Sequence, residues 1–351
     1  MNRKQKFIQQ WKRKGSVFSF LFFVLLFHFF SSCEKRAARH QQTIQWMQDD
    51  KKVKVLTTTN MINDLVKEIG GDYVNSMSLI QGELDPHSYQ LVKGDDEKLR
   101  YAEIIFYNGL GLEHGPSLYQ YLMNSDRAVA LGDWLEKQNK EQIIYVNGYK
   151  DPHVWMDIEL WSQTIPLIVE TLSEQTPQHA SYYRENGRKL QLEMAAVHHD
   201  VTEQLHAIPE KQRYLVTSHD AFNYFARAYL SEQEERKSGR WRKRFAAPEG
   251  LAPESQLSTS HIRAIIDYLK AHQVHLLFPE TNVSQDSIRK IVQAGKEEGL
   301  DIQVACCPLY GDAMGPLGSE GESYLKMIRY NGRVLAEQMN DQSKKLLSEK
   351  Y

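Results

Sequence analysis

The sequence predicts an α/β fold in which two lobes with parallel sheets are joined by a long spine helix, and three observations lead to this prediction. Apolar strand-like runs alternate with helical segments along the chain, a pattern typical of parallel sheets. With 351 residues, the chain exceeds the size at which a single hydrophobic core stops growing, which favours two lobes. Between Pro177 and Pro209, about 31 residues have the apolar spacing of one helix.

Residues 1–32 differ from the rest of the chain and have the layout of a secretory signal. Six basic residues and no acidic one precede the apolar run Val17–Phe30. This run of 14 residues is shorter than the roughly 20 that a membrane span needs. Small residues directly before Cys33 resemble a lipoprotein cleavage site, although Phe30 stands where such sites usually have leucine. Lipidation of Cys33 and a signal without a lipid therefore remain alternatives, and we expect the polar residues 33–52 to form a tether.

The N-terminal lobe is expected to cover residues 53–177. The alternating run Val53–Thr57 predicts its first strand, and Asn60 can cap a helix that ends at Gly70 and Gly71. The segments that follow are predicted as the strand Met77–Ile80, the helix Asp95–Tyr101, the strand Glu103–Tyr107 and the strand-like run Ile143–Val146.

The spine helix is predicted over residues 178–208. At 1.5 Å per residue it would be roughly 46 Å long, so we expect it to resist wide hinge motion between the lobes. Gly187 interrupts its pattern. Its apolar face is formed by Leu190, Met194, Val197, Val201 and Leu205.

The C-terminal lobe, residues 209–351, repeats the alternation of strands and helices. Its predicted strands are Arg213–Thr217, Val274–Phe278 and Ile302–Cys306, and its predicted helices are Ile262–Lys270, Ile288–Lys296 and Tyr324–Met339.

Charge and cysteine content exclude some classes of protein. Removal of residues 1–32 takes away six of 43 Lys and Arg and leaves 37 against 45 Asp and Glu, a formal charge of −8. This balance disfavours nucleic acid as a partner. Cys306 and Cys307 are neighbours in sequence and poorly placed for a relaxed disulfide, so we expect two buried thiols in a strand.

The strongest functional signal is the tripeptide Asp-Pro-His, which ends at His87 and again at His153. Proline fixes its own φ, so each imidazole follows a stiff turn, and neutral imidazole is the commonest metal ligand in proteins. His219 and Asp312 likewise lie a few residues beyond strand-like runs, where α/β sheets place their ligands. We predict that these four residues hold one divalent ion of Zn, Mn or Fe between the lobes, with Glu280 as a supporting partner or alternate ligand.

Five segments of the chain resemble, in order, the motifs of the zinc, manganese and iron ABC-transporter solute-binding proteins (TroA-like and ZnuA-like). These segments are Asp85–Tyr89, Asp151–Asp157, Thr217–Phe225, Gly250–Ser255 and Leu309–Asp312. The resemblance covers about residues 53–340, and in detail, including Trp241–Ala246, the chain looks most like the chlamydial members.

This resemblance implies a class III-type periplasmic binding protein with two Rossmann-like lobes. It implies capture of the metal in the cleft and delivery to an ABC permease and its ATPase subunit, in the periplasm, by a monomer that is not an enzyme. His87, His153, His219 and Asp312 match the four ligand positions of the family one by one.

Two departures from the family pattern leave the metal open among Zn, Mn and Fe. Zinc-specialised members often carry a His-rich acidic loop between the first two motifs, and this sequence has none. Manganese-specialised members usually have glutamate at the third ligand position, which here is His219.

Other functions remain alternatives. A metal-binding adhesin or structural lipoprotein is the first of them. A zinc hydrolase is less favoured because four protein ligands would close the site to water and the sequence lacks His-Glu-x-x-His. The basic run Arg236–Arg244 is expected to be a solvated loop, with docking to the permease or an anionic membrane as the alternative.

Overall fold

The structure is a computed structural model that describes residues 41–252 and 257–348. The predicted signal and Cys33 lie outside these residues. The chain divides after Asp50 into two compact units. In the first unit residues 41–48 are helical, whereas the sequence predicted only a polar tether. Among the described helices, none has both the length and the apolar character needed to cross a bilayer.

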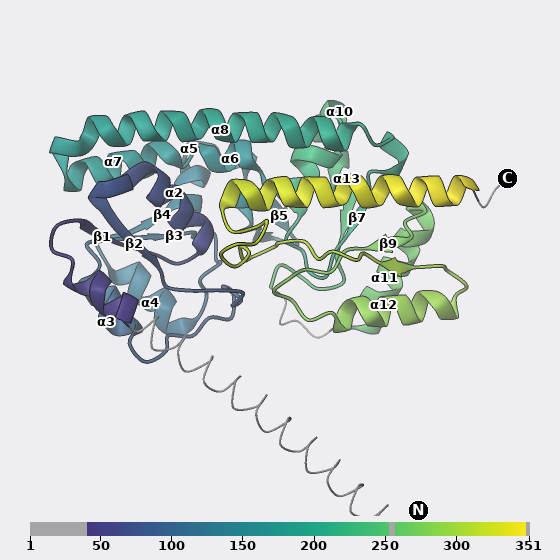
Figure 1. Cartoon of the computed structure of the whole chain (residues 1–351). Coiled ribbons are helices and arrows are strands. Elements are labelled where there is room, and N and C mark those ends of the chain that lie inside the picture. The colour runs from purple at the N-terminus through teal and green to yellow at the C-terminus, as the bar shows by residue number, and fades with distance from the viewer. Residues whose placement is uncertain (1–40, 253–256, 349–351) are drawn as a thin grey trace, which may run out of the picture. The chain divides into compact units, whose positions relative to one another are not determined.

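The N-terminal lobe is built on a parallel sheet with the strand order β2-β1-β3-β4 (Figure 1). All five residues of the inner strand β1 are buried, as expected for a strand covered on both faces. The strands are β1 (Val53–Thr57), β2 (Val74–Ser78), β3 (Ile104–Tyr107) and β4 (Ala128–Ala130).

Six helices complete this lobe. The first begins at Asn60, but its cap is Thr59, whose hydroxyl accepts a hydrogen bond from the backbone N–H of Ile62 at 3.5 Å. The helices are α2 (Asn60–Gly70), α3 (Asp95–Tyr101), α4 (Pro116–Asn124), α5 (Leu131–Gln138), α6 (Ile158–Ser162) and α7 (Ile165–Gln175).

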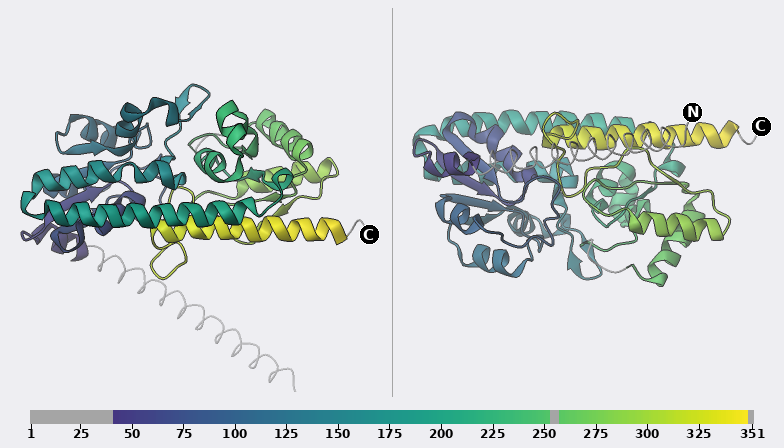
Figure 2. Two further views of the ribbon diagram at one scale, coloured as in Figure 1. Left: turned by 90° about the horizontal axis from the view of Figure 1, so that it is seen from above. Right: turned by 60° about the horizontal axis from the view of Figure 1, so that its bottom comes forward.

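The long helix α8 (Ala180–His206) follows a 3₁₀ turn over Pro177–His179. The five apolar residues predicted to form its inner face are all buried. The helix continues through Gly187. The absence of a side chain at this position lets α7 approach closely, because a Cβ there would lie 2.8 Å from Cγ2 of Val169 on α7. α8 packs against α2 and α7 of the N-terminal lobe and against the C-terminal helix α13 (Tyr324–Ser348) (Figures 1 and 2).

The strands of the C-terminal lobe are shorter than predicted. β7 (Leu215–Val216) pairs with β8 (Phe245–Ala246), and β9 (Leu276–Leu277) pairs with β10 (Gln303–Val304), both in parallel. The backbone N–H of Phe278 donates to the carbonyl of Val216 at 2.9 Å and joins the two pairs. The helices before α13 are α9 (Asn223–Phe225), α10 (Gln233–Ser238), α11 (Thr259–His272) and α12 (Asp286–Glu297). Both lobes are therefore α/β with parallel strands, which confirms the predicted fold class.

A small antiparallel hairpin precedes the second Asp-Pro-His turn. It consists of β5 (Tyr145–Val146) and β6 (Tyr149–Lys150). The connecting residues Asn147 and Gly148 have φ of +50° and +85°, the left-handed values of a type I′ turn. The sequence analysis identified the first strand but missed the second, although Asn-Gly is the usual signal for such a hairpin.

The basic run Arg236–Arg244 is only partly a solvated loop. Arg244 is buried: its Nη2 donates to Glu210 Oε1 at 2.8 Å and its Nε to Glu235 Oε2 at 2.9 Å. Trp241 is buried as well. These side chains therefore stabilise the lobe, and the expectation of a wholly solvated run was wrong.

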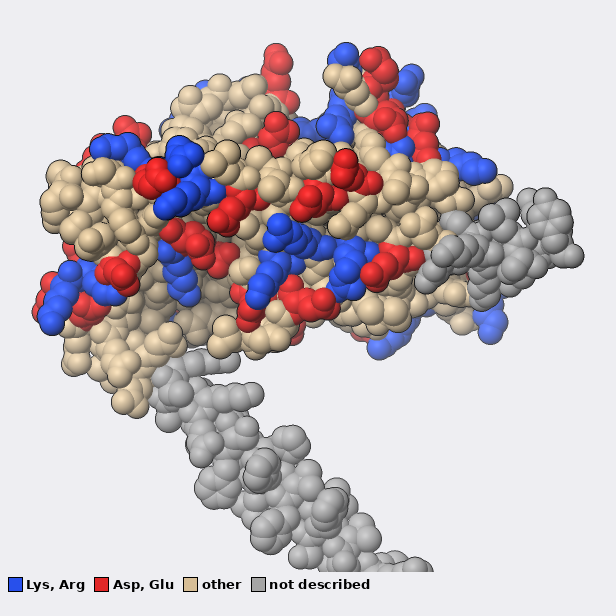
Figure 3. All heavy atoms as spheres, turned by 45° about the horizontal axis from the view of Figure 1, so that its top comes forward, with Lys and Arg blue, Asp and Glu red and all other residues tan. Residues whose placement is uncertain are grey.

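Acidic and basic side chains are interspersed on the face that carries α8 and α13 (Figure 3). Several form ion pairs within a helix, such as Arg188 with Glu185 at 3.0 Å. Others join the two helices, such as Arg329 of α13 with Asp200 of α8 at 3.8 Å. This face therefore offers no extended field of one sign to an anionic polymer.

Candidate metal centre

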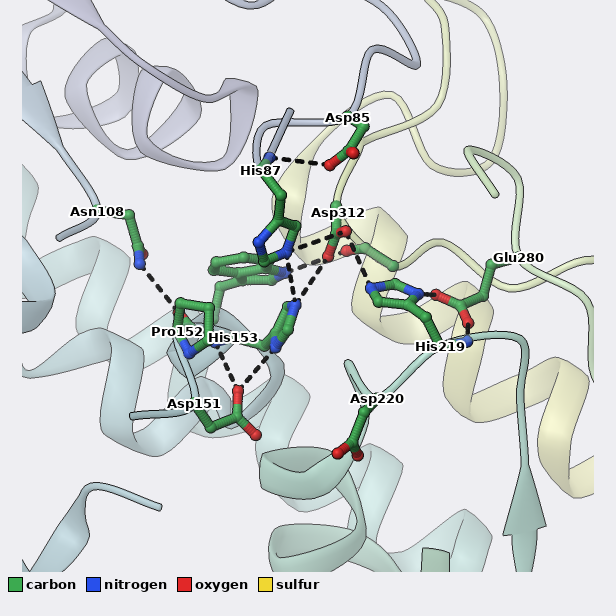
Figure 4. A network of polar contacts seen from close by, with 12 residues as sticks. Asp85, His87, Asn108, Asp151, Pro152, His153, His219, Asp220, Glu280 and Asp312 are labelled. Atoms are coloured by element: carbon green, nitrogen blue, oxygen red, sulfur yellow. Dashed lines mark hydrogen bonds and ion pairs between the residues drawn. The ribbon is translucent and has the colours of Figure 1, made fainter. Parts of the chain in front are cut away.

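Four side chains from distant parts of the chain meet between the lobes. One ligand atom from each of His87, His153, His219 and Asp312 lies within 4.8 Å of the other three, and all four residues are buried. They point toward one another (Figure 4). Nε2 of His87 lies 3.2 Å from Nε2 of His153, and Nε2 of His219 lies 3.0 Å from Oδ2 of Asp312.

These atoms have the character of ligands rather than of a hydrogen-bonded core. Both carboxylate oxygens of Asp312 and Nε2 of His219 are buried, and their only polar neighbours among the described residues are the other members of this group. Buried polar atoms are almost always paired, so such a group needs an explanation. A cation at the common centre would satisfy all of them, and three imidazoles with one carboxylate suit a transition metal.

The first Asp-Pro-His turn fixes the backbone that carries His87. Oδ1 of Asp85 accepts a hydrogen bond from the backbone N–H of His87 at 2.8 Å, and its Oδ2 accepts one from the hydroxyl of Ser88 at 2.8 Å. This is the local bonding by which aspartate stabilises turns. Within residues 41–252 and 257–348, no carboxylate contacts Nδ1 of His87.

The second turn holds the imidazole as well as the backbone. Oδ1 of Asp151 accepts from the backbone N–H of His153 at 2.9 Å and lies 2.7 Å from Nδ1 of the same residue. Its Oδ2 accepts from Nδ2 of Asn223 at 3.0 Å. A proton on Nδ1 leaves the lone pair of Nε2 free to face the centre. Asp151 therefore orients the imidazole of His153, a role that the sequence analysis did not assign to it.

Glu280, three residues beyond the end of β9, holds the backbone and the imidazole of His219 in the same way. Its Oε1 accepts hydrogen bonds from the backbone N–H groups of Ser218 and His219 at 3.0 and 2.9 Å. Its Oε2 lies 2.7 Å from Nδ1 of His219. Of the two roles predicted for Glu280, its position corresponds to the supporting partner.

The segment that carries Asp312 passes close to this carboxylate. A Cβ at position 311 would lie 2.4 Å from Oε2 of Glu280, so only glycine fits there. Nε1 of Trp155 donates to the carbonyl of Gly311 at 3.1 Å. Asn331 of α13 accepts from the backbone N–H of Tyr310 at 3.0 Å and donates to its carbonyl at 2.8 Å. These contacts hold the carboxylate of Asp312 in place.

The charges of the centre shift the pKa values of its members in opposite directions. Burial would raise the pKa of Asp312, but His219 and His153 outweigh it and hold that pKa well below its usual value. Burial would lower the pKa of His153, yet the two carboxylates beside it raise it to about 9. Burial is likewise outweighed at His219, whose pKa is raised by Glu280 and Asp312. At His87 burial prevails and lowers the pKa. The metal-free centre thus carries protons that an ion must displace.

Comparison with known proteins gives the family. Residues 55–338 match the family described as zinc-uptake complex component A, periplasmic (ZnuA). The chain belongs to this family. It is 39% identical over 290 residues to the metal-binding protein YtgA of Chlamydia trachomatis, which covers 83% of this chain and 87% of the relative. It is 31% identical over 285 residues to the manganese-binding lipoprotein MntA of Bacillus subtilis, which covers 80% and 88%.

Solved structures agree with this assignment. The crystal structure of Fe(III)-bound YtgA from Chlamydia trachomatis superposes with a TM-score of 0.77 at 38% identity and covers 82% of this chain and 98% of that chain. The periplasmic zinc-binding protein TroA of Treponema pallidum gives a TM-score of 0.73 at 28% identity, with 82% and 99% covered. The predicted resemblance to metal ABC-transporter solute-binding proteins, including chlamydial ones, is confirmed, and the ZnuA family is a class of solute-binding proteins.

A cavity of about 670 Å³ lies beside this ZnuA-family site. Among the four candidate ligands, only His87 lines it. His114 lies on its wall, with its ring centroid 5.9 Å from that of His87. The cavity therefore reaches the centre from the side of the first Asp-Pro-His turn.

Proposed function

We propose that this chain is the substrate-binding component of an ABC importer that captures one transition-metal ion in its interlobe site and delivers it to a membrane permease. The observation that carries the proposal is the buried group of His87, His153, His219 and Asp312, in which one ligand atom from each lies within 4.8 Å of the others. Four protein ligands would fill a tetrahedral sphere, as suits a carrier better than a hydrolase, which keeps a position for water.

The proposal extends to the parts of the chain and its location. Residues 1–32 would direct export to the periplasm, residues 33–52 would link the protein to the envelope, and Cys33 is the proposed site of a lipid. The lobes would cover residues 53–177 and 209–351, with 178–208 between them. The proposed partners are the permease and its ATPase subunit. Relatives with names that mention a lipoprotein support the location.

The identity of the metal is proposed only as Zn, Mn or Fe. Names and titles of relatives mention zinc, manganese and Fe(III). The donor set of three imidazoles and one carboxylate is compatible with all of these metals.

The test is elemental analysis of purified residues 34–351, stripped of metal, equilibrated separately with Zn(II), Mn(II), Fe(II) and Fe(III), and dialysed. We expect about one retained ion per chain, and its loss when Asp312 or His219 is replaced by alanine. Asp267→Ala on α11 is the matched control, because this carboxylate is exposed and lies outside the centre. Failure to retain any of these ions would contradict the proposal and favour the alternative of a structural lipoprotein.

A further inference from the structure

Two adjacent thiols in the C-terminal lobe contact each other at the surface. Sγ of Cys306 lies 3.1 Å from Sγ of Cys307. Cys306 is exposed and Cys307 is partly buried. They occupy a bend just after β10, so the expectation of two buried thiols in a strand was wrong. Neither belongs to the metal centre.

A disulfide bond between two adjacent cysteines can form but is easily reduced again. The Cα atoms of neighbouring residues are about 3.8 Å apart, below the roughly 4.4–6.8 Å that relaxed disulfides span. A bond between these sulfurs would therefore be strained, and strained disulfides are reduced more readily than structural ones. Such a pair suits a reversible modification better than a permanent crosslink.

The pair is tied to the segment that carries a metal ligand. Asp312 follows Cys307 by only five positions. The backbone N–H of Cys306 donates to Oε1 of Gln338 at 3.1 Å, and the hydroxyl of Tyr330 donates to the carbonyl of Pro308 at 3.2 Å. Both partners lie on α13, which also holds the next residues on the way to Asp312. The backbone distortion caused by a strained disulfide ring at 306–307 would have to be accommodated within this short segment, which is held at several points by α13.

We propose that Cys306 and Cys307 form a redox-active dithiol, and that closing their disulfide shifts Asp312 and weakens metal retention. This inference rests on the proposed metal-carrier function. Export would place the pair in a compartment where disulfides form. Metal release would then respond to the oxidation state of the surroundings.

The oxidation proceeds by exchange with a small-molecule disulfide. The exposed thiolate of Cys306 attacks one sulfur of that disulfide and releases a small thiolate. Cys307, after losing its proton, attacks Sγ of Cys306 and expels the second small thiolate. Two protons leave the protein, two sulfurs are oxidised and one small disulfide is reduced. The hydrogen bond to Cys306 and burial raise the pKa of Cys307, which leaves the exposed Cys306 as the first nucleophile.

The experiment compares two redox states of residues 34–351, in which these are the only thiols. The protein is equilibrated with mixtures of reduced and oxidised glutathione and desalted without air. Intact mass after alkylation then counts free thiols, and a competition titration with Mn(II) and Zn(II) measures affinity. The double variant Cys306→Ser/Cys307→Ser, which cannot form the ring, is the control.

We expect the oxidised protein to have lost two hydrogen atoms and to carry no glutathione. Its metal affinity should be lower by about tenfold or more, the size of loss that follows when contacts supporting a metal ligand are altered. The double variant should bind like the reduced protein under either treatment. Absence of the ring at every glutathione ratio would overturn the proposal, and so would a ring that leaves affinity unchanged. If neither state binds metal, the carrier function fails and the coupling with it, while the thiol count still reports the ring.

Discussion

The two Asp-Pro-His turns have the same tripeptide but hold their imidazoles differently. Asp151 is fully buried, and one of its oxygens contacts both the backbone N–H and Nδ1 of His153. Asp85 is only partly buried, and its oxygens bond the backbone of His87 and the hydroxyl of Ser88 instead. The comparison teaches that the tripeptide sets the turn, while the surrounding lobe decides whether its carboxylate also orients the imidazole.

The largest effect should come from removing the imidazoles themselves. We expect His153→Ala and His87→Ala each to weaken metal binding by more than about 100-fold, since a lost ligand exceeds a lost supporting contact. Only His153→Ala leaves a buried carboxylate without its imidazole, which costs about 1–3 kcal/mol of unfolding free energy. Competition titration and denaturant unfolding of the metal-free proteins measure the two effects. Equal destabilisation by both variants would remove the distinction between the turns.

Substitution of the aspartates in the two turns should change metal affinity less than removal of an imidazole does. Asp151→Asn keeps the shape but removes the charge that fixes the proton on Nδ1 of His153, so we expect affinity to fall by about 10–100-fold. Asp85→Asn is the matched control in the other turn, and we expect a change below about threefold because its carboxylate contacts no imidazole. Calorimetric titration with one metal compares them. A similar loss of affinity in both variants would show that affinity depends on the turn and not on a carboxylate charge beside the imidazole.

Proton release gives a third contrast between the turns. A metal must displace the proton of His153, whose pKa is raised to about 9, but none from His87, whose pKa is lowered. Because proton and metal compete for the same nitrogen, affinity should fall as pH drops below about 9, by up to about tenfold per pH unit for each proton released.

Calorimetry in buffers of different ionisation enthalpy counts these protons. We expect Asp151→Asn to reduce the count at pH 8, since the charge that raises the pKa of His153 is gone, and Asp85→Asn to leave it unchanged. An affinity that does not vary between pH 6 and pH 8 would contradict the assignment of protonated imidazoles to the metal-free centre.

The smallest effect should come from the hydroxyl that completes the first turn. Ser88→Ala removes one hydrogen bond to Asp85, so we expect a loss of about 1 kcal/mol or less in unfolding free energy and nearly unchanged metal affinity. Ser238→Ala, which removes an exposed hydroxyl bonded to the carbonyl of Glu234 on α10, is the control. A large loss of affinity in Ser88→Ala would mean that this turn orients His87 more tightly than its contacts indicate.

Local patterns predicted the elements that local forces determine. The strand Val53–Thr57 and the helix Asp95–Tyr101 have the predicted bounds, because alternation and charge placement act over a few residues. The face of α8 was predicted from spacing alone. Strands of the C-terminal lobe were predicted too long, since their ends depend on pairing with partners far along the chain.

The candidate site was predicted as a set of residue types, and the structure adds their surroundings. His87 and His153 are 66 positions apart, so their 3.2 Å contact is a property of the fold. Nothing in the pattern distinguished Asp151 from Asp85, because burial by Asn223 and its neighbours makes the difference. That the four residues bind metal, and which metal, stays a prediction.

One face of helix α8 is buried from end to end against elements of both lobes, which bears on how a permease would recognise the loaded protein. A continuous helix that is packed along its length bends little, so the protein should have nearly the same shape with and without a bound ion. The charge of the centre should change little as well, because a divalent ion that displaces one proton each from His153 and His219 brings as much charge as it removes. We therefore expect the permease to distinguish the loaded from the empty protein by local contacts around the centre more than by its outline or its net charge.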